Sequence, residues 1–177
     1  MRLLTALLAL AASTFAAEIP RPLPDKHVFQ AGGGTSIDLA AYKGKVLAVE
    51  FLNTTCPHCQ KCSRSLQKMM NEYNGRGFQA IGVAVNEMAS MLVPDYVKSQ
   101  GLGFPVGWAP RELSHEFLQH PLMLIMYVPQ LLFLDKKSVI RAQYPGGDKF
   151  YENEEVNMRN QIESLLKESA APAARKK

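Results

Sequence analysis

Residues 46–59 constrain the fold more than any other stretch of the chain. Residues 46–52 form an apolar, β-branched run interrupted only by Glu50, which predicts a strand buried on both faces of a sheet. Cys56-Pro57-His58-Cys59 follows this run, and the apolar spacing then turns helical as far as Tyr73. A Cys-x-x-Cys that joins a buried strand to a helix is typical of a thiol redox site.

The order of the remaining elements indicates an α/β fold. Strands and helices alternate before a strand pair and a last helix, which favours a central mixed β-sheet flanked by helices, with an N-terminal β-hairpin extension. The pattern shows no internal repeat and predicts no second domain. We predict a hairpin from residues 27–30 and 35–39, a strand at 78–85, helices at about 90–100 and 111–119, a strand at 127–135, its hairpin partner at 139–144 and a helix at 152–167.

Length and composition predict one globular domain. The 177 residues are 47% hydrophobic and 20% charged, as a single domain usually is. We place the domain at residues 24–168, entered through an extended, proline-containing leader at 18–26. Residues 169–177 predict a disordered basic tail. Because the net charge is only +4 and the one dense basic run lies in this tail, we expect no nucleic-acid binding.

The first seventeen residues have the layout of a secretory signal peptide. Arg2 supplies a positive charge, residues 3–12 are apolar apart from Thr5, and residues 13–17 are rich in small side chains, which predicts cleavage near Ala16. The apolar run is shorter than the roughly 20 residues that span a bilayer, so an uncleaved anchor is the less favoured alternative. We therefore expect a periplasmic or secreted protein with no stable membrane span after signal cleavage.

All three cysteines, Cys56, Cys59 and Cys62, lie within residues 56–62. Cysteines so close together enclose no loop long enough to stabilise a secreted domain, so we interpret them as chemical groups. The helix dipole favours a thiolate at Cys56, and Cys59, one turn later, would resolve a mixed disulfide. This chemistry needs no cofactor beyond the dithiol. Its partners would be protein thiol or disulfide substrates and a redox partner protein.

Pro57 and His58 are expected to tune this pair. A histidine beside the nucleophile can donate a hydrogen bond or a positive charge to the thiolate, which makes the disulfide more oxidising. Cys62 shares the apolar helix face with Leu66, so we favour a buried, inert thiol over an auxiliary redox role. On an ideal helix Cys62 rises roughly 9 Å from Cys56, too far for a disulfide without unwinding.

Metal binding is an alternative use of these donors. Zinc sites draw their ligands from separated clusters, and donors crowded onto one helical turn close a tetrahedron poorly, so we predict no resident metal. A copper-handling, metallochaperone-like binding protein stays open as an alternative function, because thioethers could join the cysteines. Core filling is the simpler role for these methionines, which are Met88, Met91, Met123 and Met126. A redox-inert interaction domain is a third alternative, weakened by the intact cysteine pair.

The stretch from Leu39 to Cys62 resembles the thioredoxin-like superfamily, nearest to its exported TlpA/ResA-type thiol–disulfide oxidoreductases. In that branch a Leu…Gly-Lys-Val…Phe…Cys-x-x-Cys run leads into the active site, and residues 104–106 and 128–135 match its downstream landmarks. The resemblance covers residues 24–168. It implies a thioredoxin fold and an enzyme that exchanges disulfides with protein thiols.

The resemblance also assigns roles to individual positions. It implies that Pro129 is a cis-proline facing the cysteines and that Val128 presents its backbone to an incoming substrate strand. Pro57 and His58 join Val128 as candidate substrate-binding residues. The family usually has Trp before the first cysteine, where this chain has Thr55. The Pro-His dipeptide is the one found in strongly oxidising DsbA-like proteins, so we expect a reduction potential in the more oxidising half of the range.

Glu50 is the charged residue inside the predicted central strand. The resemblance places it where thioredoxin has its buried carboxylate. A buried, unpaired carboxyl has a raised pKa and could accept the proton of Cys59 during exchange. The alternative is a carboxylate paired with a lysine such as Lys45 or Lys61.

Three other side chains are candidates for structural roles only. His115 and His120 flank an apolar patch of a predicted helix, and a surface or capping role is favoured over a catalytic one. Trp108 lies in a stretch bounded by glycine and proline, which predicts packing in a loop.

Overall fold

Strand β4 (Val46–Leu52) lies in the middle of the sheet, and all seven of its residues are buried. On one side β5 (Phe78–Ala84) runs parallel to β4, and on the other β7 (Gln130–Leu134) runs antiparallel. The apolar run predicted this burial on both faces. Within residues 17–168 the strand order is β1-β8-β7-β4-β5-β6-β2-β3, where the outer strands are β1 (Arg21–Pro22), β8 (Val139–Tyr144), β6 (Val106–Trp108), β2 (Val28–Gln30) and β3 (Ser36–Asp38).

This computed structural model describes residues 17–168. The predicted signal peptide lies outside the described residues except for Ala17, and the predicted tail at 169–177 lies outside them entirely. No helix in the described part is both long enough and apolar enough to cross a bilayer.

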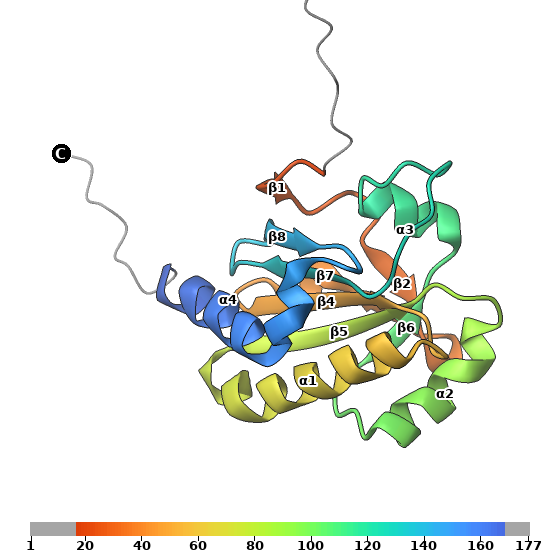
Figure 1. The fold of residues 1–177 in the computed structure, drawn as a ribbon, viewed down its shortest axis with the longest axis horizontal. Coiled ribbons are helices and arrows are strands. Elements are labelled where there is room, and N and C mark those ends of the chain that lie inside the picture. The colour runs from red at the N-terminus through yellow and green to blue at the C-terminus, as the bar shows by residue number, and fades with distance from the viewer. Residues whose placement is uncertain (1–16, 169–177) are drawn as a thin grey trace, which may run out of the picture.

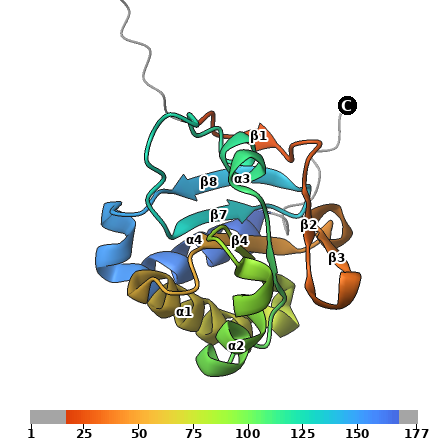
Figure 2. The ribbon, with the colours of Figure 1, turned by 90° about the vertical axis from the view of Figure 1, so that its right-hand side faces the viewer.

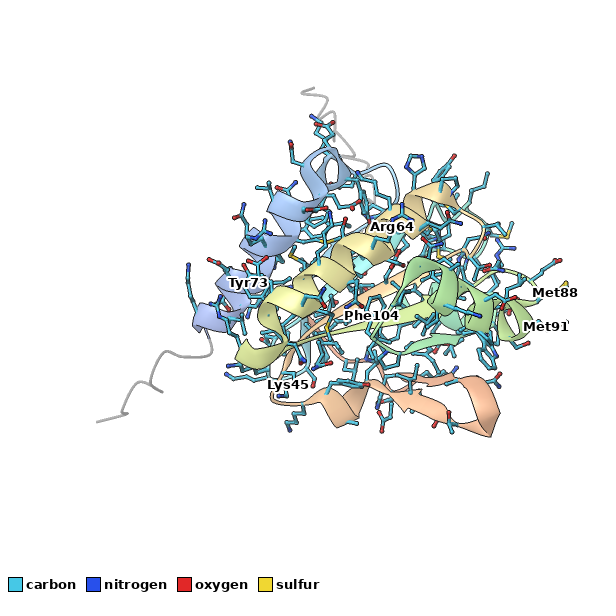
Figure 3. All side chains as sticks on the ribbon, turned by 90° about the horizontal axis from the view of Figure 1, so that it is seen from below. Lys45, Arg64, Tyr73, Met88, Met91 and Phe104 are labelled. Atoms are coloured by element: carbon cyan, nitrogen blue, oxygen red, sulfur yellow. The ribbon has the colours of Figure 1, made fainter. Side chains whose placement is uncertain are left out.

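Helices cover both faces of the sheet (Figures 1 and 2). α1 (Pro57–Tyr73), α2 (Ala89–Gln100) and α4 (Glu154–Glu168) pack on one face, and α3 (Arg111–Phe117) packs on the other. Viewed from below, α1 runs between α4 and α2 (Figure 3). The mixed sheet flanked by helices is therefore confirmed.

The N-terminal hairpin is also confirmed. β2 and β3 pair antiparallel, and β2 joins the sheet where Gln30 pairs with Trp108 of β6. The prediction that Trp108 lies in a loop is wrong, because it ends a strand and its Nε1 donates to Gln30 Oε1 at 2.8 Å. Gly107 suggested a loop, but a Cβ there would lie 2.3 Å from the Gln30 carbonyl oxygen. The glycine admits a neighbouring strand instead of making a turn.

The proline-containing leader is more ordered than its composition predicted. Arg21 pairs with Ile140 across β1 and β8. The Arg21 guanidinium is buried and donates to the carbonyl oxygen of Phe117 at 3.2 Å and to Gln143 Oε1 at 2.7 Å. This edge strand is only two residues long, so no alternation pattern could reveal it.

Several element boundaries differ from the predicted ones, most of them by a single residue. β7 begins at Gln130 and not at residue 127, because Pro129 has no N–H to donate to a ladder. A 3₁₀ turn, η4 (Lys149–Asn153), precedes α4, with Asp148 Oδ1 accepting from the Phe150 N–H at 2.7 Å. α3 ends at Phe117, two residues earlier than expected.

Candidate active site

Cys56 is the N-cap residue of α1, and Pro57 takes the first helical position. The Cys56 backbone is extended, and its carbonyl oxygen accepts from the Gln60 N–H at 3.0 Å. Cys56 is half-buried, Pro57 and His58 are exposed, and Cys59 is fully buried. A substrate can therefore reach the first sulfur while the second is shielded, as a nucleophile and a resolving thiol require.

Asn86, just after β5, fixes the loop that leads to Cys56. Its Oδ1 accepts from the Thr54 N–H at 3.0 Å, and its Nδ2 donates to Thr54 Oγ1 at 3.1 Å. Asn53 Oδ1 accepts from the N–H and the hydroxyl of Thr55, at 3.0 and 2.8 Å. The carboxyl ends of the parallel strands β4 and β5 meet at one edge of the sheet, which brings Asn86 beside Thr54. Hydrogen bonds thus fix the polar loop that precedes the cysteine pair.

Cys59 is held as a neutral thiol. The Asn53 N–H donates to its Sγ at 3.4 Å, which favours a thiolate. Burial outweighs this contact and, together with the charges of Glu50 and Cys56, raises the pKa of Cys59 far above its ordinary value. Cys59 therefore needs a proton acceptor before it can attack a disulfide.

Glu50 is a buried carboxyl on the strand that precedes the cysteine pair. It is 0% exposed, and Ser63 Oγ donates to its Oε2 at 2.6 Å. Burial raises the pKa of Glu50 to about 8 and Glu154 adds to the rise, while the Ser63 hydrogen bond and a weak polar contact from Cys62 oppose it. Its Oε1 has no hydrogen-bond partner of good geometry among the described residues. The predicted burial and raised pKa are confirmed.

The alternative of a lysine partner for Glu50 is wrong. Within residues 17–168, neither Lys45 nor Lys61 forms an ion pair with it. The Lys61 ammonium instead lies 3.9 Å from Oε2 of Glu154, at the start of α4. Among the described residues, Glu50 therefore has no cation paired with it to keep it ionised.

The Val128–Pro129 peptide bond is cis, as the resemblance implied. Hydrogen bonds anchor this loop from two sides. The Tyr151 hydroxyl contacts the carbonyl oxygens of Pro129 and Tyr144, both at 2.9 Å, and burial raises the pKa of Tyr151 so that it stays a donor. Gln130 Nε2 donates to the carbonyl oxygen of Tyr127 at 2.8 Å.

A cavity of about 490 Å³ separates the start of α1 from this loop. His58 lies on one wall, and Val128 and Pro129 lie on another. Pro57 is exposed but does not line the cavity. The structure thus brings three of the candidate residues around one opening, with Glu50 and Cys59 buried. The rest of the lining comprises Lys61, Tyr127, Gly146, Gly147, Asp148, Tyr151, Glu152 and Glu154.

The remaining sulfur atoms divide into two groups. Cys62 is 0% exposed, as predicted. The expectation that the methionines fill the core is wrong for three of them, since Met88, Met91 and Met123 are 62%, 69% and 95% exposed. Met88 and Met91 project together at the start of α2 (Figure 3). Among the described residues, no group of three His, Cys, Asp or Glu side chains could hold a metal ion.

His115 is buried, so of the predicted surface or capping role the surface alternative is wrong, and its Nδ1 lies 3.2 Å from the carbonyl oxygen of His120. Its Nε2 accepts from Arg111 Nε at 3.3 Å, and its ring meets that of His120 edge to face at 5.0 Å. Arg111 also donates to the carbonyl oxygen of Leu122 at 3.0 Å. These contacts brace the segment that leads to the cis-proline, which is a structural role.

Sequence reasoning missed three residues that position the site: Ser63, Tyr151 and Asn86. Ser63 lies four positions after Cys59 on a helix, hence on the same face, and a polar residue there signals a buried partner. Asn86 follows a buried strand at the edge where Cys56 lies, which is a comparable signal. Nothing in the local sequence indicates the contact of Tyr151 with Pro129.

Residues 19–143 match the model of the AhpC/TSA family. The chain belongs to the AhpC/TSA family. It is 34% identical over 73 residues to the thiol-disulfide oxidoreductase ResA of Halalkalibacterium halodurans, and the match spans 41% of this chain and 41% of that relative. The alignment therefore covers about two fifths of the curated relative's length.

Solved structures confirm the thioredoxin-like fold. A protein assigned as the thiol:disulfide interchange protein DsbE of Chlorobium tepidum superposes with a TM-score of 0.71 at 16% identity, covering 85% of this chain and 99% of that one. A thiol:disulfide interchange protein of the thioredoxin family from Chlorobium tepidum TLS gives a TM-score of 0.68 at 25% identity, with the same coverage. Together with the ResA match, these findings support a TlpA/ResA-type thioredoxin-like protein.

Proposed function

We propose that this AhpC/TSA family member is a thiol–disulfide oxidoreductase that exchanges disulfides with protein thiols through Cys56 and Cys59. One observation carries the proposal. Cys56 is half-buried at the N-cap position of α1, Cys59 is fully buried one turn further along, and the strand that precedes them carries a buried carboxyl, Glu50, with a raised pKa. The thiol-disulfide oxidoreductase ResA is similar in sequence to part of this chain, which supports the same chemistry.

The reaction would run in two balanced exchanges. In the reducing direction the Cys56 thiolate attacks a substrate disulfide, forms a mixed disulfide and expels one substrate thiolate. Cys59 then gives its proton to Glu50 and attacks the Cys56 sulfur. This step releases the second substrate thiolate and leaves a Cys56–Cys59 disulfide. Two electrons pass to the substrate, and the oxidising direction is the reverse.

The substrate would lie against the cis-proline loop. Val128 would offer its backbone to an extended segment, as the resemblance implies, with Pro129, Pro57 and His58 around the reacting sulfur. The 490 Å³ cavity between His58 and Pro129 leaves room for side chains next to the substrate cysteine. The chemistry needs no cofactor beyond the dithiol, and a redox partner protein would return the pair to its starting state.

The proposed place of action rests on the sequence. The layout of the first seventeen residues supports export, and we propose a periplasmic or secreted location.

Trapping the mixed disulfide tests the proposal. Removing the resolving thiol with Cys59→Ser should let a disulfide-containing peptide accumulate as an adduct on Cys56, measured by mass spectrometry of the intact protein. Cys56→Ser should form no adduct, and Cys62→Ser should turn over without trapping. An adduct on Cys62, or none on Cys56, would contradict the proposal.

A copper-handling role is the second candidate function. The observation that favours it is the exposure of Met88, Met91 and Met123, since soft thioethers at a surface can bind Cu(I). A Cu(I) titration of the reduced protein in competition with a chelator separates the two functions. Tight retention that Cys56→Ser abolishes, without any disulfide exchange by the native protein, would favour copper handling.

A further inference from the structure

Glu50 belongs to a short chain of buried hydrogen bonds that links three elements. Ser63 Oγ, on α1, donates to Glu50 Oε2 at 2.6 Å, and the same Oγ lies 2.7 Å from the Tyr96 hydroxyl on α2. Glu50 and Ser63 are 0% exposed and Tyr96 is 4% exposed. Water therefore does not compete strongly for any of these contacts.

The proton positions in this chain follow from its chemistry. An ionised carboxylate only accepts, so the single hydroxyl proton of Ser63 is committed to Glu50. The Ser63 oxygen must then accept from Tyr96, whose pKa burial raises well above its ordinary value. Two donors in series thus point toward Glu50 Oε2, while Oε1 has no hydrogen-bond partner of good geometry among the described residues and the Cys62 thiol makes only a weak polar contact with the carboxyl. Oε1 keeps a free lone pair for an incoming proton.

We propose that Ser63 and Tyr96 are positioning residues that fix the Glu50 carboxyl and stabilise its ionised form, so that Oε1 takes the proton of Cys59. This inference rests on the proposed thiol–disulfide exchange. It assigns Ser63 and Tyr96 a part in the step that resolves the mixed disulfide. Without their hydrogen bonds, burial alone would keep Glu50 protonated and unable to act as a base.

Other titratable groups also face Glu50 and set the background for this effect. Cys59 and Cys62 come from α1, Tyr151 from η4 and Glu154 from α4. Glu154 carries the like charge that disfavours ionisation of Glu50. The hydrogen bonds from Ser63 and Tyr96 favour ionisation of Glu50, and so oppose the effects of the Glu154 charge and of burial.

The helix supplies a matched control two residues along. Ser65 Oγ donates to Glu154 Oε1 at 2.6 Å, and Ser65 is 2% exposed. Ser63→Ala and Ser65→Ala therefore remove the same group from the same helix, with the same bond length and similar burial. They differ in which carboxyl loses its donor.

The experiment follows the Glu50 carboxyl and the resolving step separately in the full chain. A ¹³C NMR titration of the Glu side-chain carboxyls reports the Glu50 pKa, and stopped-flow single turnover with a mixed-disulfide peptide on Cys56 reports resolution between pH 6 and 10. Ser63→Ala should raise the midpoint of the NMR titration and the midpoint of the rate–pH profile by roughly one pH unit each, as expected for a lost hydrogen bond to a charge. At pH 7 it should slow resolution about tenfold. Tyr96→Phe should shift both the same way by less.

Two comparisons make the result decisive. Ser65→Ala should not raise either midpoint, and Ser63→Ala should have no further effect in a Glu50→Gln background. Unmoved midpoints in both Ser63→Ala and Tyr96→Phe would overturn the inference, as would an equal rise in Ser65→Ala. If Ser63→Ala does not fold, Tyr96→Phe decides alone. A native protein that exchanges no disulfide refutes the proposed function, whereas the NMR midpoints test the positioning role without activity.

Discussion

The backbone N–H of Asn53 donates to the Sγ of Cys59 across 3.4 Å, so the loop that enters the motif also contacts its second cysteine. This contact lowers the pKa of Cys59, but burial raises it by far more. The resolving thiol is thus stable when protonated and depends on its neighbours for activation. The site is organised around that dependence, with the buried Glu50 carboxyl as the proposed proton acceptor.

Glu50 should make folding stability depend on pH. Its pKa is raised from 4.5 to about 8 in the folded state, so the folded protein binds one more proton than the unfolded chain between these values. The contribution of Glu50 to the free energy of unfolding is fully present below pH 4.5 and is lost as the pH rises toward 8. Above pH 8 it no longer changes with pH. Glu50→Gln should remove this slope and be more stable than the native protein at pH 8 by a few kcal/mol, because each tenfold change in proton affinity corresponds to about 1.4 kcal/mol.

Urea unfolding at pH values from 5 to 9 measures this slope in both proteins. The control is Glu72→Gln, which changes an exposed carboxyl that Arg159 binds at 2.8 Å and so should leave the slope between pH 5 and 8 in place. Parallel curves for Glu50→Gln and the native protein would show that Glu50 is ionised across this range.

Asn86→Ala should loosen the loop that precedes Cys56. The substitution removes both hydrogen bonds to Thr54 and leaves the Thr54 N–H unpaired, at a cost of about 1–3 kcal/mol. We expect a lower free energy of unfolding and slower attack by Cys56, measured by urea unfolding and by the rate of alkylation. Asn71→Ala, which removes an exposed asparagine bonded to Gln67 on α1, should change neither. Equal effects of the two substitutions would refute a specific role for Asn86.

Gly146→Ala should displace the loop before the cis-proline. A Cβ at Gly146 would lie 2.8 Å from the Tyr127 carbonyl carbon and 2.9 Å from its oxygen, so the backbone must move. We expect kcat/KM for a protein disulfide to fall roughly tenfold, because small displacements at a reacting centre are costly. Gly75→Ala is the control, since a Cβ there meets nothing within 4 Å. Native kinetics in Gly146→Ala would mean that this loop does not set substrate position.

Cys62→Ala should leave the exchange chemistry intact. Cys62 is fully buried behind the pair and is expected to contribute packing only, so the loss of its sulfur should cost about 1 kcal/mol or more. Insulin reduction and urea unfolding measure the two properties. Loss of turnover in a folded Cys62→Ala protein would give Cys62 an auxiliary redox role.

The sequence predicted the features that follow from the spacing of apolar residues and from the position of a charged residue within an apolar run. The run at 46–52 indicated a strand buried on both faces, and Glu50 within it indicated a buried carboxyl with a raised pKa; both are confirmed. The sequence did not predict the two-residue strand β1 or the strand that ends at Trp108. Proline and glycine in these segments indicate loops, and both strands form only by pairing with segments distant in the sequence. The bond from Tyr151 to Pro129 spans 22 positions and leaves no local trace.

The equilibrium of the cysteines with glutathione tests the central claim most directly. The full chain is equilibrated with graded ratios of reduced and oxidised glutathione, quenched in acid and mapped by mass spectrometry. We predict a disulfide between Cys56 and Cys59 alone, with Cys62 reduced throughout and a potential between about −120 and about −200 mV, the more oxidising half of the range for dithiol enzymes. A bond that includes Cys62, or a Cys56–Cys59 pair that stays reduced at every ratio, would contradict the assignment of these two cysteines as the redox pair.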